Sequence, residues 1–555
     1  MKKMTGAKII IETLIEQGVD TIFGYPGGAV LSIYDEIYSA CDRLTHYISC
    51  HEQGAAHAAD AYARVTGKTG VVIATSGPGA TNLVTGIANA YLDSTPMVAI
   101  TGNVAQNLIG RDSFQEVDIC GVTMPITKHN YIVKDISRLA DIIREAFMIA
   151  NTGRPGPVLI DVPKDIQTAQ TEYQPKEKQY VEKQHKNGSA AFKTALEIIK
   201  EANRPFIYAG GGVIISDAAE ELKTFSDKID APIGTSMMGL AAVRADNPRF
   251  LGMTGMHGKF AASKAMSEAD LIIAIGTRFS DRATGNKREF VSGKKILHID
   301  IDPAEIGKNI PVYVSLVGDV KNILTKLVTE LPEIGRTEWA SRIAEIKTSP
   351  DSHLEMDKSR LNPQSIIETV AKYAGKNAVV ATDVGQHQMW TAQYYKFLKP
   401  RTFVTSGGLG AMGFGMGAAI GAAIGSKERT VLFTSDGSFH MNMNEMATAV
   451  TNQLPILIVL LNNNALGMVR QWQTLFFGCR YSNTTLNRAT DYVKLADAFG
   501  MKAKRLTDIS ELEDTVKTAL SLNEPFLIDA VIDSDEKVLP MIPPNGTIND
   551  IILKG

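Results

Sequence analysis

The sequence predicts an α/β protein built from three doubly wound domains with mainly parallel sheets. The chain has 555 residues, whereas a single hydrophobic core stops growing at roughly 250–300 residues. Short β-branched runs alternate with amphipathic helical patterns, which is typical of parallel sheets covered by helices. In the first and last parts of the chain, a strand-like run repeatedly ends in a glycine-rich turn that starts a helix. We therefore expect two similar modules on either side of a different middle one.

Two charged stretches of low apolar content mark the domain boundaries. Residues 171–190 and 332–363 have the composition of interdomain linkers. They separate a first domain at residues 1–175, a second at 190–335 and a third at 363–545. Each of these segments contains several strand-like runs, so each can form a sheet and a core of its own.

The composition argues against several classes of function. The formal net charge is -3, and no Lys/Arg tract indicates binding to nucleic acid or to an anionic membrane. The N-terminal segment lacks the apolar centre and cleavage site of a signal peptide, and no run of about 18 apolar residues could span a membrane. The four cysteines show no C-x-x-C spacing, which indicates reduced thiols in a cytoplasmic protein.

A carboxylate and an amide follow two strand-like runs in the third segment. The run VLFTS leads into Asp436-Gly437-Ser438, and the run ILIVLL leads into Asn462-Asn463. Ligands bind at the carboxyl ends of neighbouring strands in open α/β sheets. A carboxylate and an amide oxygen, with a diphosphate, suit Mg²⁺, and Ser438 can present its N–H at a helix start. Either pair alone is more often a turn, but their spacing favours a metal and diphosphate site.

Glu52 stands where a strand-like run meets a helix rich in small residues. An acid at a helix start is often only a surface residue stabilised by the helix dipole, and that alternative stays open for Glu52 taken alone. Further along, Gln386 and His387 follow another strand-like run, and Met412 lies within a glycine-rich run. A methionine most often fills a gap in a core, and a single histidine is most often structural.

Together these segments resemble thiamine-diphosphate enzymes. The pattern H-E-Q-G-A-x-x-x-A-D-A-Y-A-R around Glu52 resembles their catalytic-glutamate segment, and D-G…N-N resembles their metal signature. Ser435 departs from that signature, because the family usually has glycine before the aspartate. Longer segments resemble the large catalytic subunit of the acetohydroxyacid synthase family over nearly the whole chain. They are residues 23–29, 114–116, 126–130, 154–158, 255–258, 276–282 and 466–472.

The resemblance implies which residues carry the chemistry. Glu52 would hydrogen-bond the aminopyrimidine ring of thiamine diphosphate and exchange a proton with it. The Gly410 carbonyl would meet the amino group of that ring, and Met412 would hold the two cofactor rings in a bent arrangement. The implied catalytic residues are Glu52, Gly28, Gln115, Lys164 and Arg282. Further implied cofactor contacts are Tyr25, Gln386, His387, Gly437, Ser438 and Met468, and the implied Mg²⁺ ligands are Asp436, Asn463 and Ala465.

The same resemblance implies that the middle domain is of the FAD-binding type and lies between two thiamine-diphosphate-binding modules. Its segment GTRFSDRATG resembles the R-F-D-D-R segment of the family, with Ser280 in place of the first aspartate. Asp300 ends a strand-like run, where an acid can take ribose hydroxyls. The implied FAD contacts are Arg154, Gly211, Gly212, Met256, His257, Arg278, Asp300 and Asp319.

The second substrate would bind between Arg282 and Trp472. A guanidinium group matches a carboxylate bidentately, and Phe114, Met468 and Trp472 would shape the pocket around its alkyl group. One methylene is worth only about 1–3 kcal/mol in such a pocket, so preference for 2-ketobutyrate over pyruvate should be real but finite. Plainer alternatives stay open: Arg282 in a surface ion pair with a neighbouring acid, and Trp472 in ordinary core packing.

The implied activity is that of an acetolactate synthase, the first step of branched-chain amino-acid (valine, leucine, isoleucine) biosynthesis. Pyruvate would be decarboxylated on thiamine diphosphate and its hydroxyethyl unit transferred to a second 2-keto acid. Pyruvate as acceptor gives 2-acetolactate, and 2-ketobutyrate gives 2-aceto-2-hydroxybutyrate. Two alternatives stay open. One is a pyruvate oxidase or another 2-keto acid carboligase, and the other is a non-catalytic regulatory paralogue, which Ser435 and Ser280 would favour.

The resemblance also implies partners. The family builds its active site between two subunits, with Glu52 from one and Asp436 from the other, so a homodimer or homotetramer is expected. Members often take a small regulatory subunit that confers feedback by branched-chain amino acids. Neither expectation follows from composition.

Overall fold

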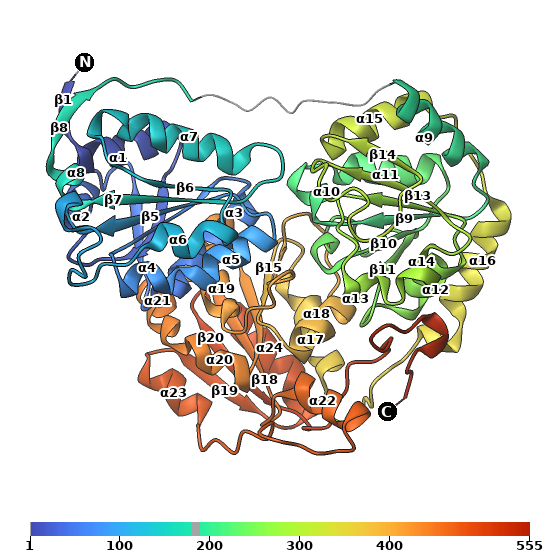
Figure 1. The fold of residues 1–555 in the computed structure, drawn as a ribbon. Helices are drawn as coiled ribbons and strands as arrows, with labels where there is room; N and C mark the ends of the chain where they lie inside the picture. The colour runs from blue at the N-terminus through green and yellow to red at the C-terminus, as the bar shows by residue number, and fades with distance from the viewer. Residues whose placement is uncertain (1, 179–188, 555) are drawn as a thin grey trace.

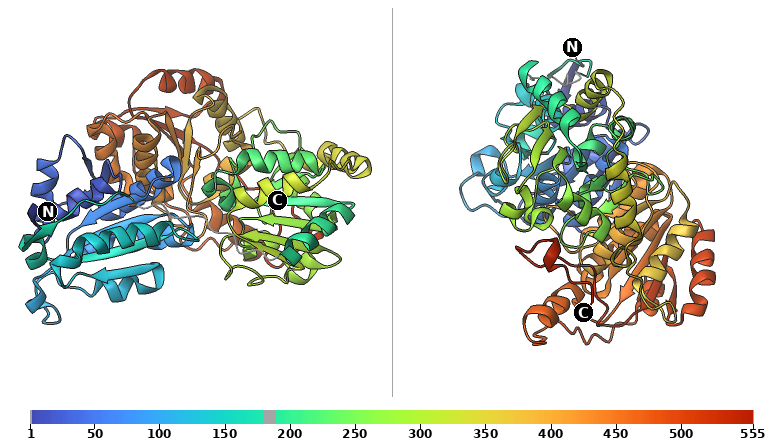
Figure 2. Two further views of the ribbon diagram at one scale, coloured as in Figure 1. Left: turned by 90° about the horizontal axis from the view of Figure 1, so that it is seen from above. Right: turned by 90° about the vertical axis from the view of Figure 1, so that its right-hand side faces the viewer.

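The computed structural model describes residues 2–178 and 189–554 as three domains, each with a six-stranded parallel sheet (Figure 1). The N-terminal and middle domains lie next to each other, and the C-terminal domain packs against both (Figure 2). Residues 179–188 of the first predicted linker lie outside the described residues. In the two described ranges, no helix combines the length and the apolar character needed to cross a membrane.

The sheet of the N-terminal domain has the strand order β3-β2-β4-β5-β7-β6. Its central strands are buried along their whole length because helices cover both faces, which explains their content of Val, Ile and Ala. The strands are β2 (Thr21–Tyr25), β3 (Thr45–Ile48), β4 (Gly70–Ala74), β5 (Met97–Asn103), β6 (His129–Ile132) and β7 (Pro157–Pro163). The main helices are α1 (Gly6–Glu16), α2 (Leu31–Ser39), α3 (Glu52–Thr66), α5 (Val84–Leu92), α7 (Leu139–Asn151) and α8 (Lys164–Thr168). A separate antiparallel pair joins β1 (Lys2–Thr5) to β8 (Gln170–Tyr173).

The middle domain has the strand order β11-β10-β9-β12-β13-β14. The strands are β9 (Pro205–Ala209), β10 (Ile233–Thr235), β11 (Phe250–Met253), β12 (Leu271–Ile275), β13 (Lys295–Asp300) and β14 (Val314–Val317). The main helices are α9 (Ser189–Glu201), α10 (Gly211–Ile215), α11 (Ala219–Lys228), α12 (Phe260–Glu268), α13 (Asp281–Thr284), α15 (Val320–Glu330) and α16 (Thr337–Thr348). Helix α16 begins in the second charged stretch, yet it packs Trp339 and Ile343 into the core of this domain.

The C-terminal domain has the strand order β16-β15-β17-β18-β20-β19. The strands are β15 (Val379–Thr382), β16 (Phe403–Val404), β17 (Thr430–Ser435), β18 (Ile456–Asn462), β19 (Lys502–Leu506) and β20 (Phe526–Val531). The helices are α17 (Pro363–Ala374), α18 (Gln386–Tyr394), α19 (Phe414–Ser426), α20 (Asp436–Asn442), α21 (Met446–Thr451), α22 (Gly467–Phe476), α23 (Tyr492–Ala498) and α24 (Leu512–Ser521).

The two outer domains share one topology, and the middle domain has another. In both outer sheets the second strand along the chain lies at one edge beside the first, and the fifth lies at the other edge beside the sixth. In the middle sheet the first strand lies at the centre and the order reverses there, as in dinucleotide-binding folds. The expectation of two similar modules around a different one is confirmed, and so is the predicted fold class.

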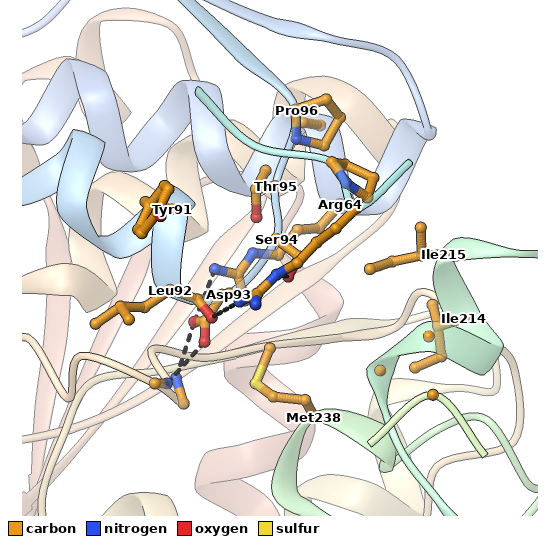
Figure 3. A pocket seen from close by; sticks show the side chains of 18 of the residues that line it. Arg64, Tyr91, Leu92, Asp93, Ser94, Thr95, Pro96, Ile214, Ile215 and Met238 are labelled. Atoms are coloured by element: carbon orange, nitrogen blue, oxygen red, sulfur yellow. Dashed lines mark hydrogen bonds and ion pairs between the residues drawn. The ribbon is translucent and has the colours of Figure 1, made fainter. Parts of the chain in front are cut away.

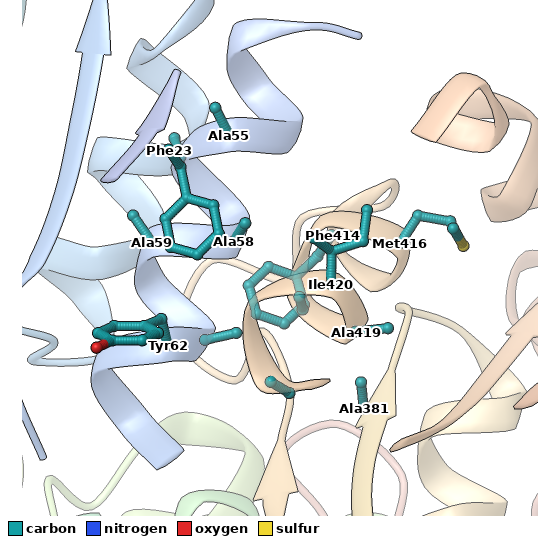
Figure 4. Close-up of a cluster of buried hydrophobic side chains, with 14 of the residues drawn as sticks. Phe23, Ala55, Ala58, Ala59, Tyr62, Ala381, Phe414, Met416, Ala419 and Ile420 are labelled. Atoms are coloured by element: carbon teal, nitrogen blue, oxygen red, sulfur yellow. The ribbon is translucent and has the colours of Figure 1, made fainter. Parts of the chain in front are cut away.

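The N-terminal and C-terminal domains meet where α3 crosses α19 (Figure 4). Both helices are rich in alanine and glycine, so their backbones approach closely. A Cβ atom on Gly421 would overlap the carbonyl oxygen of Ala58, and one on Gly417 would lie 2.5 Å from the carbonyl oxygen of Gly54. One hydrophobic cluster runs through this crossing and includes Phe414. The two domains therefore share a core.

Replacing Gly421 with alanine should lower the free energy of unfolding by about 1–3 kcal/mol, because an added methyl group would force two helix backbones apart. Urea unfolding measures the loss. The matched control is Gly335→Ala, at an exposed glycine with no atom within 4 Å of the new Cβ and no positive φ. Equal stability of the two variants would contradict the close crossing.

Candidate active site

A cavity of about 2500 Å³ lies where the three domains meet. Figure 3 shows part of its wall, formed by residues of the N-terminal domain, by α10 and by Met238 of the middle domain. The FAD contacts implied by the sequence all line it: Arg154, Gly211, Gly212, Met256, His257, Arg278, Asp300 and Asp319. Gly410, Met468, Trp472 and Arg282 line it as well. The structure thus gathers residues from all three domains around one space.

The middle-domain wall of the cavity has the features of a dinucleotide site. Gly212, at the start of α10 after β9, and Gly276, directly after β12, approach so closely that a Cβ on Gly276 would lie 2.6 Å from the Cα of Gly212. Asp300 ends β13, and burial raises the pKa of its carboxyl to about 6. His257 is buried, and its Nδ1 has no hydrogen-bond partner among the described residues. Close glycine turns, a carboxylate and an unpaired ring nitrogen fit FAD.

Two other implied FAD contacts already have protein partners. Arg154 donates to Glu305 at 2.8 Å, which joins the N-terminal domain to the middle domain. Asp319 begins α15 as its N-cap and accepts a hydrogen bond from Ser216 at 2.7 Å. Ser280, at the point of departure from the family pattern, is exposed at the start of α13.

Arg282 and Trp472 lie close together in the wall of the cavity. The Cζ of Arg282 lies 5.7 Å from the centroid of the Trp472 ring, and its Nη1 lies 3.5 Å from the sulfur of Met256. The guanidinium also lies 3.7 Å from Asp281, but both side chains of that pair are largely exposed, so the pair adds little. Within the described residues, Arg282 therefore keeps guanidinium donors available for a carboxylate beside the ring of Trp472.

The catalytic residues implied for the N-terminal domain lie along the carboxyl edge of its sheet. Tyr25 ends β2 and Gly28 follows it, while Lys164 begins α8 directly after β7 and is exposed. Gln115 has a φ of 59°, a left-handed conformation that is uncommon for a residue other than glycine. Phe114 beside it is 86% exposed and is not among the residues that line the cavity with Arg282, Met468 and Trp472.

Glu52 is the first residue of α3, and its side chain is buried. One carboxylate oxygen accepts a hydrogen bond from Asn82 at 2.9 Å. Just before it, Glu445 of the C-terminal domain accepts from the backbone N–H groups of Cys50 at 3.1 Å and His51 at 3.0 Å. Burial raises the pKa of Glu445 above its usual value. No local pattern in the sequence predicts this contact, because the two segments lie 394 residues apart.

Asp436 is the first residue of α20, at the carboxyl end of β17. It is 3% exposed, and its Oδ1 has no hydrogen-bond partner among the described residues. Burial raises the pKa of this carboxyl to about 6. Ser435 before it has φ -133°, an extended conformation that any residue adopts. A serine therefore fits where the family has glycine, which removes one argument for a non-catalytic paralogue.

The other implied metal and diphosphate residues lie beside Asp436. Asn463 follows β18, and its Oδ1 accepts from the N–H of Ala465 at 3.2 Å. Gln386 is turned inward and donates to Gln471 at 3.0 Å and to the Glu536 carbonyl at 2.7 Å.

His387 is also buried at this edge of the sheet, and burial lowers the pKa of its ring to about 3. Its Nε2 has no hydrogen-bond partner among the described residues. Two buried unpaired atoms, an acidic oxygen and a ring nitrogen, fit a Mg²⁺–diphosphate group. No cluster of three or more His, Cys, Asp or Glu side chains that could hold a metal occurs in residues 2–178 and 189–554. A Mg²⁺ ion at Asp436 would therefore take its other ligands from amide and carbonyl oxygens and from a diphosphate.

The glycine-rich turn before α19 is held by a second buried carboxylate. Asp383, directly after β15, accepts from the N–H groups of Gly413 at 2.8 Å and Gly415 at 3.3 Å. Burial raises its pKa to about 6, against the effect of these amides. Met412 is only half-buried and belongs to none of the hydrophobic clusters of the described residues, which argues against simple core packing.

Comparison with known proteins agrees with this geometry. Residues 4–122 match the N-terminal TPP binding domain of thiamine pyrophosphate enzymes, 192–327 the central domain and 383–530 the C-terminal TPP binding domain. These are enzymes of thiamine diphosphate, another name for the same cofactor. The class is therefore that of the thiamine pyrophosphate enzymes.

Full-length relatives narrow the class. The probable acetolactate synthase large subunit of Methanocaldococcus jannaschii is 46% identical over 99% of this chain and 95% of its own length. The acetolactate synthase isozyme 2 large subunit of Escherichia coli is 44% identical over 99% of this chain and 100% of its own. The acetolactate synthase large subunit of Haemophilus influenzae is 42% identical over 100% of this chain and 99% of its own length. The chain belongs to the acetolactate synthase large-subunit family.

Replacing Asp436 with asparagine should stabilise the protein in the absence of Mg²⁺. The buried ionised carboxylate costs at most ~3 kcal/mol at neutral pH, since its pKa rises from 3.8 to about 6. The native state holds this proton more tightly than the unfolded state. The gain should therefore be largest above pH 6 and should shrink as the pH falls from about 6 towards 4.

Thermal unfolding of both proteins, with and without Mg²⁺ and thiamine diphosphate, checks this expectation. The wild type should be stabilised by the added pair, and Asp436→Asn should respond little. A variant that still gains full stability from Mg²⁺ would exclude Asp436 as a metal ligand.

Proposed function

We propose that this chain is the catalytic subunit of an acetolactate synthase, which joins a two-carbon unit from pyruvate to a second 2-keto acid. The products are 2-acetolactate and 2-aceto-2-hydroxybutyrate, from which branched-chain amino acids are built. The observation that carries the proposal is the meeting of Arg282, Met256 and Trp472 at one wall of the interdomain cavity. A guanidinium beside an aromatic wall suits a small acid with a short alkyl group.

The described residues fit three bound groups. Thiamine diphosphate would lie along the carboxyl edge of the C-terminal sheet, and when bound it supplies the nucleophilic carbon at which pyruvate loses carbon dioxide. The residues that would hold it and Mg²⁺ are Asp436, Asn463, the carbonyl of Ala465, His387, Gly437, Ser438 and Gly410. FAD would occupy the middle-domain wall of the cavity, where Gly211, Gly212 and Asp300 lie.

The protein itself moves a proton and stabilises a negative charge. Glu52 is buried, and the hydrogen-bond partner of its side chain among the described residues is Asn82, so its second oxygen can exchange a proton with a ring nitrogen. Gln115 and the backbone N–H of Gly28 would donate to an oxygen that becomes negative during the reaction. Arg282 would hold the carboxylate of the second acid, and a closed cavity would keep water from that step.

The second chain of a homodimer would complete this site. No interaction described here joins Glu52 to Asp436 within the described part of one chain, although both are implied to act on one cofactor. Phe114 and Tyr25, at the carboxyl edge of the N-terminal sheet, are 86% and 40% exposed. A second copy that covers this edge would bury both. The relatives are named large subunits, which supports a smaller partner subunit for this chain too.

Turnover of pyruvate by the purified protein, with and without thiamine diphosphate and Mg²⁺, tests the proposed reaction. Acetolactate formed only when both are present supports it. Acetate made with an electron acceptor would indicate an oxidase, and no product would indicate a non-catalytic protein.

Replacing Glu52 with glutamine should lower turnover by at least about 100-fold, because an amide cannot exchange the proton. The matched control is Glu338→Gln, which makes the same change at an exposed position in the first turn of α16. Near-normal acetolactate formation by the Glu52 variant would exclude Glu52 as the proton-exchanging group.

Replacing Trp472 with leucine should mainly change the choice of second substrate. Loss of the aromatic wall removes contacts worth about 1–3 kcal/mol, so the ratio of the two products should shift roughly tenfold or more when both acids are present. Trp472→Phe, which keeps an aromatic ring, should shift it less. A product ratio unchanged in both variants would count against a pocket at Trp472.

A further inference from the structure

The turn at Gly407 and Gly408 is hydrogen-bonded to a carboxylate from another domain. Asp93, at the end of α5 in the N-terminal domain, accepts from the N–H of Gly408 at 2.7 Å and from that of Gly407 at 3.0 Å. The two bonds use different carboxylate oxygens. Figure 3 shows Asp93 pointing at this turn from across the domain boundary. The turn belongs to the C-terminal domain and leads directly to Gly410 and Met412.

Asp93 is itself fixed by a buried ion-pair network. Arg64 of α3 donates to Asp93 at 3.0 Å and also binds Asp60. The side chains of both aspartates are 0% exposed, and that of Arg64 is 12% exposed. Arg64 also donates to the carbonyl of Thr405, just before the turn, at 2.7 Å. One guanidinium cannot neutralise two buried carboxylates, so the two amides of the turn provide the remaining compensation for Asp93.

The middle domain closes on the same turn. A Cβ atom on Gly407 would overlap the sulfur of Met238, and one on Gly408 would lie 3.1 Å from Nη2 of Arg278. Gly407, Gly408 and Arg278 all line the interdomain cavity. The turn at Gly407 and Gly408, the implied FAD contact Arg278 and the C-terminal end of α5, where Asp93 lies, therefore meet at one place beside the cavity.

We propose that Asp93 is a positioning residue of the cofactor site, which acts through the amides of Gly407 and Gly408 to set the segment Gly410–Met412. This inference rests on the proposed function, because that function assigns the segment to thiamine diphosphate. Asp93 does not touch the cofactor. Its carboxylate orients the turn before the cofactor arrives, so binding need not order the turn.

Asp93→Asn tests the amide contacts, because either orientation of an asparagine amide points an NH₂ group at one of two N–H donors. The matched control is Asp60→Asn, which removes a charge from the same Arg64 network but contacts no amide of the turn. Gly408→Ala is a second variant, in which a methyl 2.9 Å from Oδ1 of Asp93 pushes the turn away while every ion pair remains.

Two measurements on the full-length protein distinguish the outcomes. Hydrogen exchange of residues 404–413, without cofactor, should be faster in Asp93→Asn and Gly408→Ala than in Asp60→Asn. Calorimetric titration with thiamine diphosphate and Mg²⁺ should give a Kd raised about tenfold or more in the first two and little changed in Asp60→Asn. Turnover of Asp93→Asn should recover substantially when thiamine diphosphate is saturating.

Each failure has its own signature. Equal shifts in Kd for Asp93→Asn and Asp60→Asn would reduce Asp93 to a structural ion pair and overturn the inference. Unchanged exchange at 404–413 in Asp93→Asn would overturn it as well. A wild-type protein that does not bind thiamine diphosphate would instead remove the proposed function, while the exchange data would still report on the amide contacts.

Discussion

The close crossing of α3 and α19 is the contact on which the rest of the structure depends. It requires small residues on both helices, and these helices begin at the two segments that carry the implied chemistry: α3 at Glu52 and α19 just after Met412. Because a side chain at Gly421 would overlap the backbone of Ala58, the two helix backbones are in direct contact, and close packing there fixes the relation between the two segments. The middle domain is then docked on that pair through Arg154 and Met238.

Two buried carboxyl groups make the N-terminal and C-terminal domains depend on each other for the shape of the proposed site. Glu445 of the C-terminal domain holds the amides that precede Glu52, and Asp93 of the N-terminal domain holds the amides that precede Gly410. Each domain thus supplies a carboxyl group that binds the amides just before a segment of the other domain for which catalysis is proposed. Buried charges are costly unless they are fully hydrogen-bonded, so these contacts are specific to one docking geometry. If the site forms between two chains, each chain contributes Glu52 to one site and Asp436 to a second site. The contacts of Glu445 and Asp93 then connect the two sites through a single chain.

Local patterns in the sequence were sufficient to predict the three sheets, but they did not predict the contacts between domains. The alternation of strands, glycine turns and helices is read over a few residues, and it predicts three parallel sheets and the likeness of the outer two. Asp436 and Asn463 could be placed at one sheet edge because parallel strands end on the same side. Glu445 could not be found, because it lies 394 residues from His51 and no local pattern pairs them. Ser435 could not be judged either, since tolerance there depends on a φ value.

The amides that Glu445 binds have a consequence for synthesis of the chain. Domains generally fold in the order in which they leave the ribosome. When the N-terminal domain has emerged, the N–H groups of Cys50 and His51 face outward with their partner still unmade, and the apolar side of α3 lacks α19. A nascent chain therefore carries an unfinished surface through the whole synthesis of the middle domain. The C-terminal domain, which is made last, covers that surface when α19 and Glu445 dock on it.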